Sequence, residues 1–186
     1  MPVTPEAREE WRAWLAKEYP DSLVEKRAGP VARIPFISPM LTWATTGGVP
    51  VGHLCRWYGP DGAGKSLINL CLIYCAQNFA EAITAQYELR IHALERMGKT
   101  LPAKKVAYEM KRLVKLFPSG METLIYDTEQ RFDEHFAANL GIDMNRVELN
   151  QENVIEEIIH QMTGAVEGYH LIIVDSVSNA QSYAEA

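Results

Sequence analysis

An eight-residue segment of this chain follows the pattern G-x-x-x-x-G-K-[ST], which few folds accommodate. Its glycines let the backbone wrap so that several N–H groups converge on phosphate oxygens, and the helix that follows adds the positive end of its dipole. In such a loop Lys65 bridges the β- and γ-phosphates of ATP, and the hydroxyl of Ser66 binds Mg²⁺. We therefore predict a phosphate-binding loop formed by Gly59, Pro60, Asp61, Gly62, Ala63, Gly64, Lys65 and Ser66.

The segments around this loop predict the fold class. Short apolar runs alternate with longer segments whose apolar residues recur at helical spacing. This alternation is typical of an α/β fold with a mostly parallel sheet flanked by helices. We expect strands at 51–58, 123–127, 146–149 and 171–175, and helices at 4–17, 64–97, 103–116 and 152–162. In the last helix the residues expected on the apolar side are Val154, Ile155, Ile158, Ile159 and Met162.

Acidic residues follow two of the predicted strands. The strand at 171–175 ends in Asp175, at the carboxyl end of the strand, where ligands bind in open α/β sheets. Asp175 is therefore predicted to hold the Mg²⁺ ion, mostly through water. Glu129 follows the strand at 123–127 and would leave the sheet near the γ-phosphate, where a carboxylate can polarise an attacking water. The alternative for Glu129 is an exposed loop acid.

Charge is distributed unevenly along the 186 residues, whose formal net charge is −6. Residues 80–120 carry 8 basic and 4 acidic side chains, whereas residues 121–186 carry 2 and 13. This balance argues against a uniformly basic surface that coats nucleic acid, but it leaves room for a local basic patch.

The cysteines and the apolar segments indicate the cellular compartment in which the protein works. An odd number of cysteines, three in all, suits reduced thiols in the cytoplasm. Cys71 and Cys75 would share a helix face, where we expect buried thiols rather than a metal pair because no further ligands are placed to complete a site. All three cysteines, Cys55 included, stand in apolar sequence. With no signal peptide and no apolar run of 18 residues, we expect neither secretion nor a membrane span.

Four stretches resemble the RecA/RadA recombinase family, especially its phage members. Leu54–Ser66 resembles the phosphate-loop region of the family, and Gly47–Gly52 the turn ahead of its first core strand. Tyr126–Glu129 with Asp133 resembles its acidic segment, and Val174–Val177 its second nucleotide-binding motif. The resemblance implies a RecA-like core of the phosphate-loop NTPase fold.

The same resemblance implies roles for particular residues. Glu129 matches the catalytic glutamate of the family, and Asp133 matches an acid that contacts the adenine amino group. Phe136 stands where the family places an aromatic ring against the base. The N-terminal helix, with Trp11 and Trp14, resembles the segment by which one protomer docks on the next in a filament.

The chain departs from the family between the phosphate-binding loop and Asp127. About forty extra residues, roughly 80–119, are predicted to form a helical hairpin with two apolar stripes and a separate basic face. The stripes are Ile83, Tyr87, Ile91 and Leu94, and Val106, Met110, Leu113, Val114 and Phe117. The basic face is Lys104, Tyr108, Lys111 and Lys115. It could contact nucleic acid, with Tyr108 stacking on bases, contact a protein partner, or serve only to solvate the helix.

A second departure lies after Asp175, where the family continues with DNA-binding loops, a γ-phosphate sensor and a further strand. We therefore expect the chain to be the N-terminal, nucleotide-binding part of a longer protein, or something else to complete its sheet. The expected division is an N-terminal helix and linker at 1–30, and an ATPase core with the insertion at 31–186.

The motifs predict a protein that binds ATP and Mg²⁺, and the resemblance implies a recombinase that acts on single-stranded DNA and assembles as a homo-oligomeric filament. The resemblance places it in the cytoplasm of a bacterium or of a phage-infected bacterial cell. Two alternatives remain open: a nucleotide-switched scaffold without DNA activity, and a hexameric helicase or loader with the same core. No arginine in this sequence can be assigned as an arginine finger, the cation that stabilises charge on the transferred phosphate.

Overall fold

The structure is a computed structural model that describes residues 13–14, 17 and 31–184. The chain forms two compact units, residues 1–31 and 32–186. In the first unit the described residues Ala13, Trp14 and Lys17 are helical, while the remainder of the helix predicted over 4–17 lies outside the described residues. The second unit contains the sheet and the predicted phosphate-binding loop.

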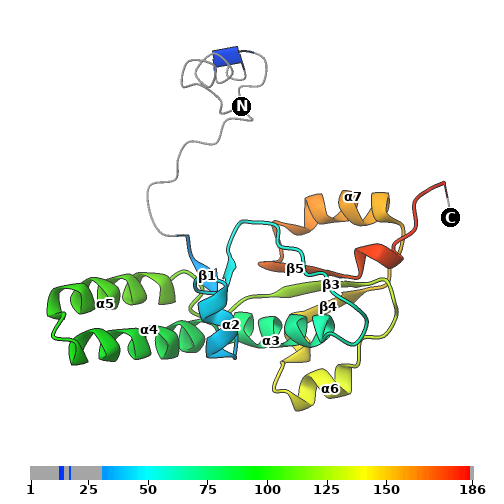
Figure 1. Ribbon diagram of the computed structural model, residues 1–186. Coiled ribbons are helices and arrows are strands. Elements are labelled where there is room, and N and C mark those ends of the chain that lie inside the picture. The colour runs from blue at the N-terminus through cyan, green and yellow to red at the C-terminus, as the bar shows by residue number, and fades with distance from the viewer. Residues whose placement is uncertain (1–12, 15–16, 18–30, 185–186) are drawn as a thin grey trace. The chain divides into compact units, whose positions relative to one another are not determined.

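A three-stranded parallel sheet lies at the centre of the second unit (Figure 1). Its middle strand is β3 (Thr123–Asp127), with β4 (Val147–Asn150) on one side and β5 (Leu171–Asp175) on the other. All five residues of β3 are buried, as is usual for a strand covered on both faces. The parallel register places Asp127 beside Asp175, so both strands end at the same edge of the sheet. The predicted α/β arrangement with parallel strands is therefore present.

Helices cover both faces of this sheet (Figure 1). Successive side chains of a strand point to opposite faces, so neighbouring residues of β3 enter different cores. Ile125 belongs to the core that includes α3 (Lys65–Gln77), whereas Leu124 packs with Ile158 of α7 (Ile155–Ala165). The sheet is thereby held between α3 and α7.

The apolar side of α7 is narrower than predicted. Ile158 is fully buried at 0% exposure, but its neighbour Ile159 is 60% exposed, so the assignment of Ile159 to the core is wrong. Two residues that are adjacent in a helix point about 100° apart, and the sheet covers only one of them.

The single helix predicted over 64–97 is also wrong, because the chain turns at Asn78. α3 ends at Gln77, and α4 (Phe79–Arg96) leaves at an angle of 94°. The carbonyl of Tyr74 accepts both from the backbone N–H of Asn78 at 3.0 Å and from its side-chain amide at 2.9 Å, so Asn78 caps the end of α3. Phe79 is then buried edge-on against Phe117, with ring centroids 5.2 Å apart.

Two helices project from this turn and run antiparallel to each other (Figure 1). They are α4 and α5 (Thr100–Val114), which pack together along most of their length. α5 begins three residues before its predicted start, because Pro102 in the first turn does not interrupt a helix there. The residues of both predicted apolar stripes are buried or half-buried: Ile83, Tyr87, Ile91, Leu94, Val106, Met110, Leu113, Val114 and, just after α5, Phe117. Among the described residues no single helix is long and apolar enough to cross a membrane; only the bent pair α3 and α4, taken together, passes on length and composition.

The strand predicted over 51–58 is wrong. β2 (Val49–Pro50) pairs antiparallel with β1 (Arg33–Ile34), and residues 54–59 then have no regular structure. In the described part of the chain no strand pairs with the 54–59 segment. The carbonyl of Gly59 at the end of this segment accepts from the ammonium of Lys65, and Leu54 is 93% exposed. A short helix, α2 (Pro39–Ala44), lies between β1 and β2 and is capped by Ser38. This helix was not predicted from the sequence.

The cysteines differ in exposure. Cys75 is buried and Cys71 half-buried on α3, whereas Cys55 is exposed although it also stands in apolar sequence. Burial raises the pKa of the Cys75 thiol to about 12, and the neighbouring Cys71 adds to the effect. Cys75 is therefore a neutral core side chain.

Candidate nucleotide-binding site

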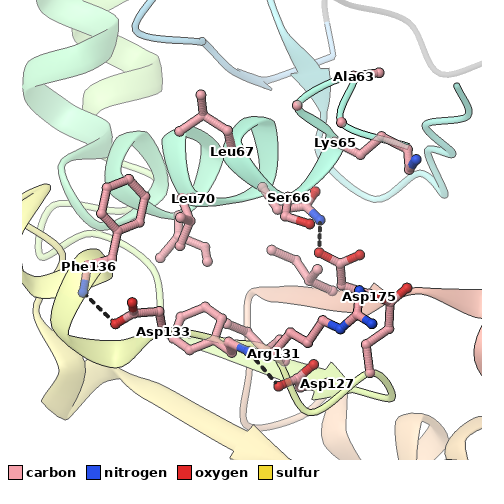
Figure 2. A pocket seen from close by; sticks show the side chains of 18 of the residues that line it. Ala63, Lys65, Ser66, Leu67, Leu70, Asp127, Arg131, Asp133, Phe136 and Asp175 are labelled. Atoms are coloured by element: carbon pink, nitrogen blue, oxygen red, sulfur yellow. Dashed lines mark hydrogen bonds and ion pairs between the residues drawn. The ribbon is translucent and has the colours of Figure 1, made fainter. Parts of the chain in front are cut away.

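A cavity of about 530 Å³ lies where the N-terminus of α3 meets the ends of β3 and β5 (Figure 2). Most of the residues predicted for the site line this single cavity. They are Asp61, Gly62, Ala63, Gly64, Lys65, Ser66, Glu129, Asp133, Phe136 and Asp175. Gly59 and Pro60 lie just outside the lining, and the predicted basic face lies on α5 instead.

The loop at 59–66 adopts a turn that depends on glycine. Gly64 directly precedes α3 with φ of +84°, a left-handed conformation that other residues adopt only with strain. The ammonium of Lys65 donates to the carbonyls of Gly59 at 2.9 Å and Pro60 at 3.1 Å, and it lies 4.0 Å from the carboxylate of Asp61. Because α3 starts at Lys65, its first N–H groups lack intrahelical partners and are suited to an anion.

Two aspartates meet at the edge of the sheet. Asp175 accepts a hydrogen bond at 3.2 Å from the side-chain amide of Asn69 on α3, which ties the helix to the end of β5 (Figure 2). Asp127, buried beside it, accepts at 2.8 Å from the backbone N–H of Phe132. Asn69 was not predicted as a site residue, because nothing in the sequence around a single asparagine indicates a hydrogen-bond partner 106 positions away.

Glu129 is held by two side chains. Its Oε1 accepts from the hydroxyl of Ser176 at 2.9 Å, and its Oε2 pairs with Arg131 at 3.4 Å. Thr128 binds the backbone of Ser176, so the ends of β3 and β5 are joined beside this carboxylate. The Asp175–Ser176 peptide bond is cis. Arg131 and Thr128 were not predicted as site residues.

Asp133 and Phe136 lie at the other end of the cavity from Lys65 (Figure 2). Asp133 caps α6 (Glu134–Asn139), accepting at 2.8 Å from the N–H of Phe136. The Phe136 ring is 46% exposed and presents an aromatic surface to the cavity. The predicted phosphate and base ends are thus at opposite ends of one cavity.

The donors in the cavity suit Mg²⁺ rather than a softer metal. Ser66 and Asp175 offer a hydroxyl and a carboxylate, both oxygen donors. The described residues include no group of three or more His, Cys, Asp or Glu side chains placed to hold a metal ion. A cation bound by Ser66 and Asp175 would therefore complete its shell with water and phosphate oxygens, as Mg²⁺ commonly does.

Comparison with known proteins gives two bacterial relatives. The chain is 29% identical over 145 residues to Protein RecA of Wigglesworthia glossinidia brevipalpis, covering 75% of this chain and 31% of that protein. It is 25% identical over 183 residues to Protein RecA of Ruminococcus albus, covering 93% and 35%. No family model matches the chain.

These similarities support a RecA-like relationship. The chain spans about a third of the length of these relatives. The parallel sheet between helices is compatible with a RecA-like α/β core.

Proposed function

We propose that this chain is the nucleotide-binding part of a RecA-like recombinase, which binds ATP with Mg²⁺, hydrolyses it and acts on single-stranded DNA in recombination and repair. The observation that carries the proposal is the convergence of Lys65, Asp175 and Glu129 on one cavity from three segments far apart in the sequence. In this proposal the N-terminal helix and linker, 1–30, dock one protomer on the next. In the same proposal residues 31–186 belong to the ATPase core, with α4 and α5 as its inserted part, in a cytoplasmic filament.

The phosphates would lie over the N-terminus of α3. Lys65 would exchange the carbonyls of Gly59 and Pro60 for phosphate oxygens, which are stronger acceptors because they are charged. Ser66 and Asp175 would hold Mg²⁺, and the cation would neutralise charge that develops on the phosphates. Asn69 would keep Asp175 oriented through its hydrogen bond.

Glu129 would act on the attacking water. Glu129 lines the same cavity as Lys65, and a carboxylate that reaches the γ-phosphate can accept a proton from water or polarise it. Ser176 and Arg131 orient the carboxylate before nucleotide arrives. Asp133 would contact the adenine amino group, and Phe136 would pack against the base.

The proposal is tested by substituting the lysine and the glutamate separately. Lys65→Ala should abolish binding of a fluorescent ATP analogue, whereas Glu129→Gln should retain binding and lower ATP hydrolysis about a hundredfold. Two exposed residues of the same type outside the cavity lining serve as matched controls: Lys99→Ala and Glu134→Gln should behave as wild type. Unchanged nucleotide binding in Lys65→Ala would refute the phosphate-binding loop.

Single-stranded DNA separates the recombinase from the two alternatives. A recombinase should hydrolyse ATP faster when single-stranded DNA is added, whereas a nucleotide-switched scaffold should not respond. Electron microscopy with ATP should show open filaments; closed hexameric rings would instead favour the helicase or loader.

A further inference from the structure

We propose that the outer face of α5 binds the phosphate backbone of single-stranded DNA. This inference rests on the proposed function, and it adds a contact surface outside the nucleotide cavity. The outer face of α5 is defined by its exposed residues Leu101, Lys104, Lys105, Tyr108, Lys111, Arg112 and the C-terminal cap Lys115.

The outer face of α5 carries charge of one sign. All five of its cationic side chains are exposed. The one carboxylate in α5, Glu109, is half-buried and accepts a hydrogen bond at 3.3 Å from the hydroxyl of Tyr87 on α4. The outer face of α5 therefore presents positive charge without a neutralising acid.

The neighbouring helix shows what an ordinary solvated face looks like here. The exposed side of α4 mixes both signs, with Glu88 and Glu95 beside Arg90 and Arg96. Interspersed charges of this kind keep a helix soluble without creating a strong local potential. α5 departs from that pattern, although both helices have similar exposure. A purely solubilising role therefore accounts for α4 but not for α5.

The spacing places the cations in a line. Lys104, Tyr108, Lys111 and Lys115 stand at positions i, i+4, i+7 and i+11, so they follow one side of the helix over about 16 Å. Val106 and Leu113 are buried on the opposite side of α5, which fixes this line toward solvent. The lysines can neutralise about three successive phosphates of a strand lying along the helix.

An aromatic ring stands inside this line of cations. Tyr108 is 74% exposed, between Lys104 and Lys111. Positive charge that follows a backbone, together with an aromatic side chain on which a base can stack, is how proteins bind single strands without sequence preference. A protein interface would instead have a core depleted of charge, and Tyr108 and Leu101 are the only large apolar side chains on this face.

Residues 121–186 of the second unit offer no equivalent surface in sequence. Residues 121–186 carry 13 acidic and 2 basic side chains, and they include the sheet and α7. Those segments repel a polyanion, whereas the outer face of α5 attracts one.

The test measures binding of a fluorescent oligothymidylate to the full chain at several salt concentrations. Lys104→Ala/Lys111→Ala should weaken binding about tenfold and reduce the slope of log affinity against log salt by about 1.4, since each phosphate contact on a single strand contributes about 0.7. Arg90→Ala/Arg96→Ala on α4 removes the same charge and is the matched control; it should leave the slope unchanged.

Tyr108 gives an independent readout. Tyr108→Ala should weaken binding about tenfold through loss of stacking while leaving the salt slope unchanged, and Tyr108→Phe should bind as wild type. Because these residues are exposed, the variants should keep the circular dichroism spectrum of the parent chain.

Two results would overturn the inference: a wild-type chain that does not bind the oligothymidylate, or a lysine double variant with unchanged affinity and slope. If that double variant instead lowers only the sedimentation coefficient of the protein, the outer face of α5 contacts a second copy of the chain. ATP binding is measured on the same variants. If the chain binds ATP but not DNA, only this inference is refuted. If α5 binds DNA but the chain does not bind ATP, only the proposed ATPase is refuted.

Discussion

Thr128 and Ser176 bind each other through two hydrogen bonds at the carboxyl ends of β3 and β5. The hydroxyl of Thr128 donates to the carbonyl of Ser176 at 2.8 Å and accepts from its N–H at 3.0 Å. The hydroxyl of Ser176 in turn donates to Glu129. The position of the proposed catalytic carboxylate therefore depends on a threonine that itself has no place in the chemistry.

Thr128→Val keeps the shape of this side chain and removes its hydroxyl. It should lower the free energy of unfolding by about 1–2 kcal/mol, because the backbone N–H and carbonyl of Ser176 lose their partner in a half-buried position. ATP hydrolysis should also fall. Thr128→Ser retains the hydroxyl and is the control in urea unfolding; equal stability of the valine and serine variants would contradict the role given to the two bonds.

Adjacent isoleucines on α7 provide a second test. Ile158→Ala should destabilise the protein by about 2–5 kcal/mol, because Ile158 is fully buried against β3. Ile159→Ala makes the same chemical change on the exposed side and should alter stability by less than about 0.5 kcal/mol. Thermal unfolding of both variants decides the point, and similar losses would mean that Ile159 is also covered.

The three cysteines should react at different rates. At pH 8 an aromatic disulfide reagent should label Cys55 first, because it is exposed, while Cys75 reacts only when the protein unfolds. Burial raises the pKa of the Cys75 thiol to about 12, so the reactive thiolate is scarce even where the reagent could enter. Cys55→Ser should remove the fast phase. A fast phase that survives this change would show that α3 opens readily.

Tyr87 should make the α4–α5 packing sensitive to alkaline pH. Burial and the nearby Glu109 raise the pKa of Tyr87 to about 12 from 10. The folded state therefore binds the phenolic proton more tightly than the unfolded state, and stability is fully present below about pH 10 and declines as the pH rises toward 12. Absorbance titration of tyrosinate should show a late-titrating group that is missing in Tyr87→Phe. If the two titrations coincide, the Tyr87–Glu109 contact does not form in solution.

Local patterns predicted much of the sheet. The runs at 124–126 and 171–174 are continuously apolar because their strands are covered on both faces, and this pattern can be read from consecutive residues alone. The Gly-rich loop is equally local, because its backbone conformation depends on its own glycines. These segments carry most of the predicted cavity residues.

Other features depend on partners that lie far away in the chain. Apolar periodicity continues through Asn78, yet the helix ends there because Phe79 packs against Phe117. The apolar run at 51–58 has strand-like residues, but a strand exists only when a neighbour pairs with its backbone.

The sequence by itself determined the strands that are buried on both faces, the phosphate-binding pattern and the positions of the acids that follow the strands. Those are properties of consecutive residues. Only the tertiary structure decided which of two adjacent isoleucines is buried, that Asn69 holds Asp175, and that Thr128 holds Ser176 beside Glu129. The physical reason is that a hydrogen bond or the burial of a side chain requires two groups to come into contact. The local sequence around one of these groups does not indicate the other.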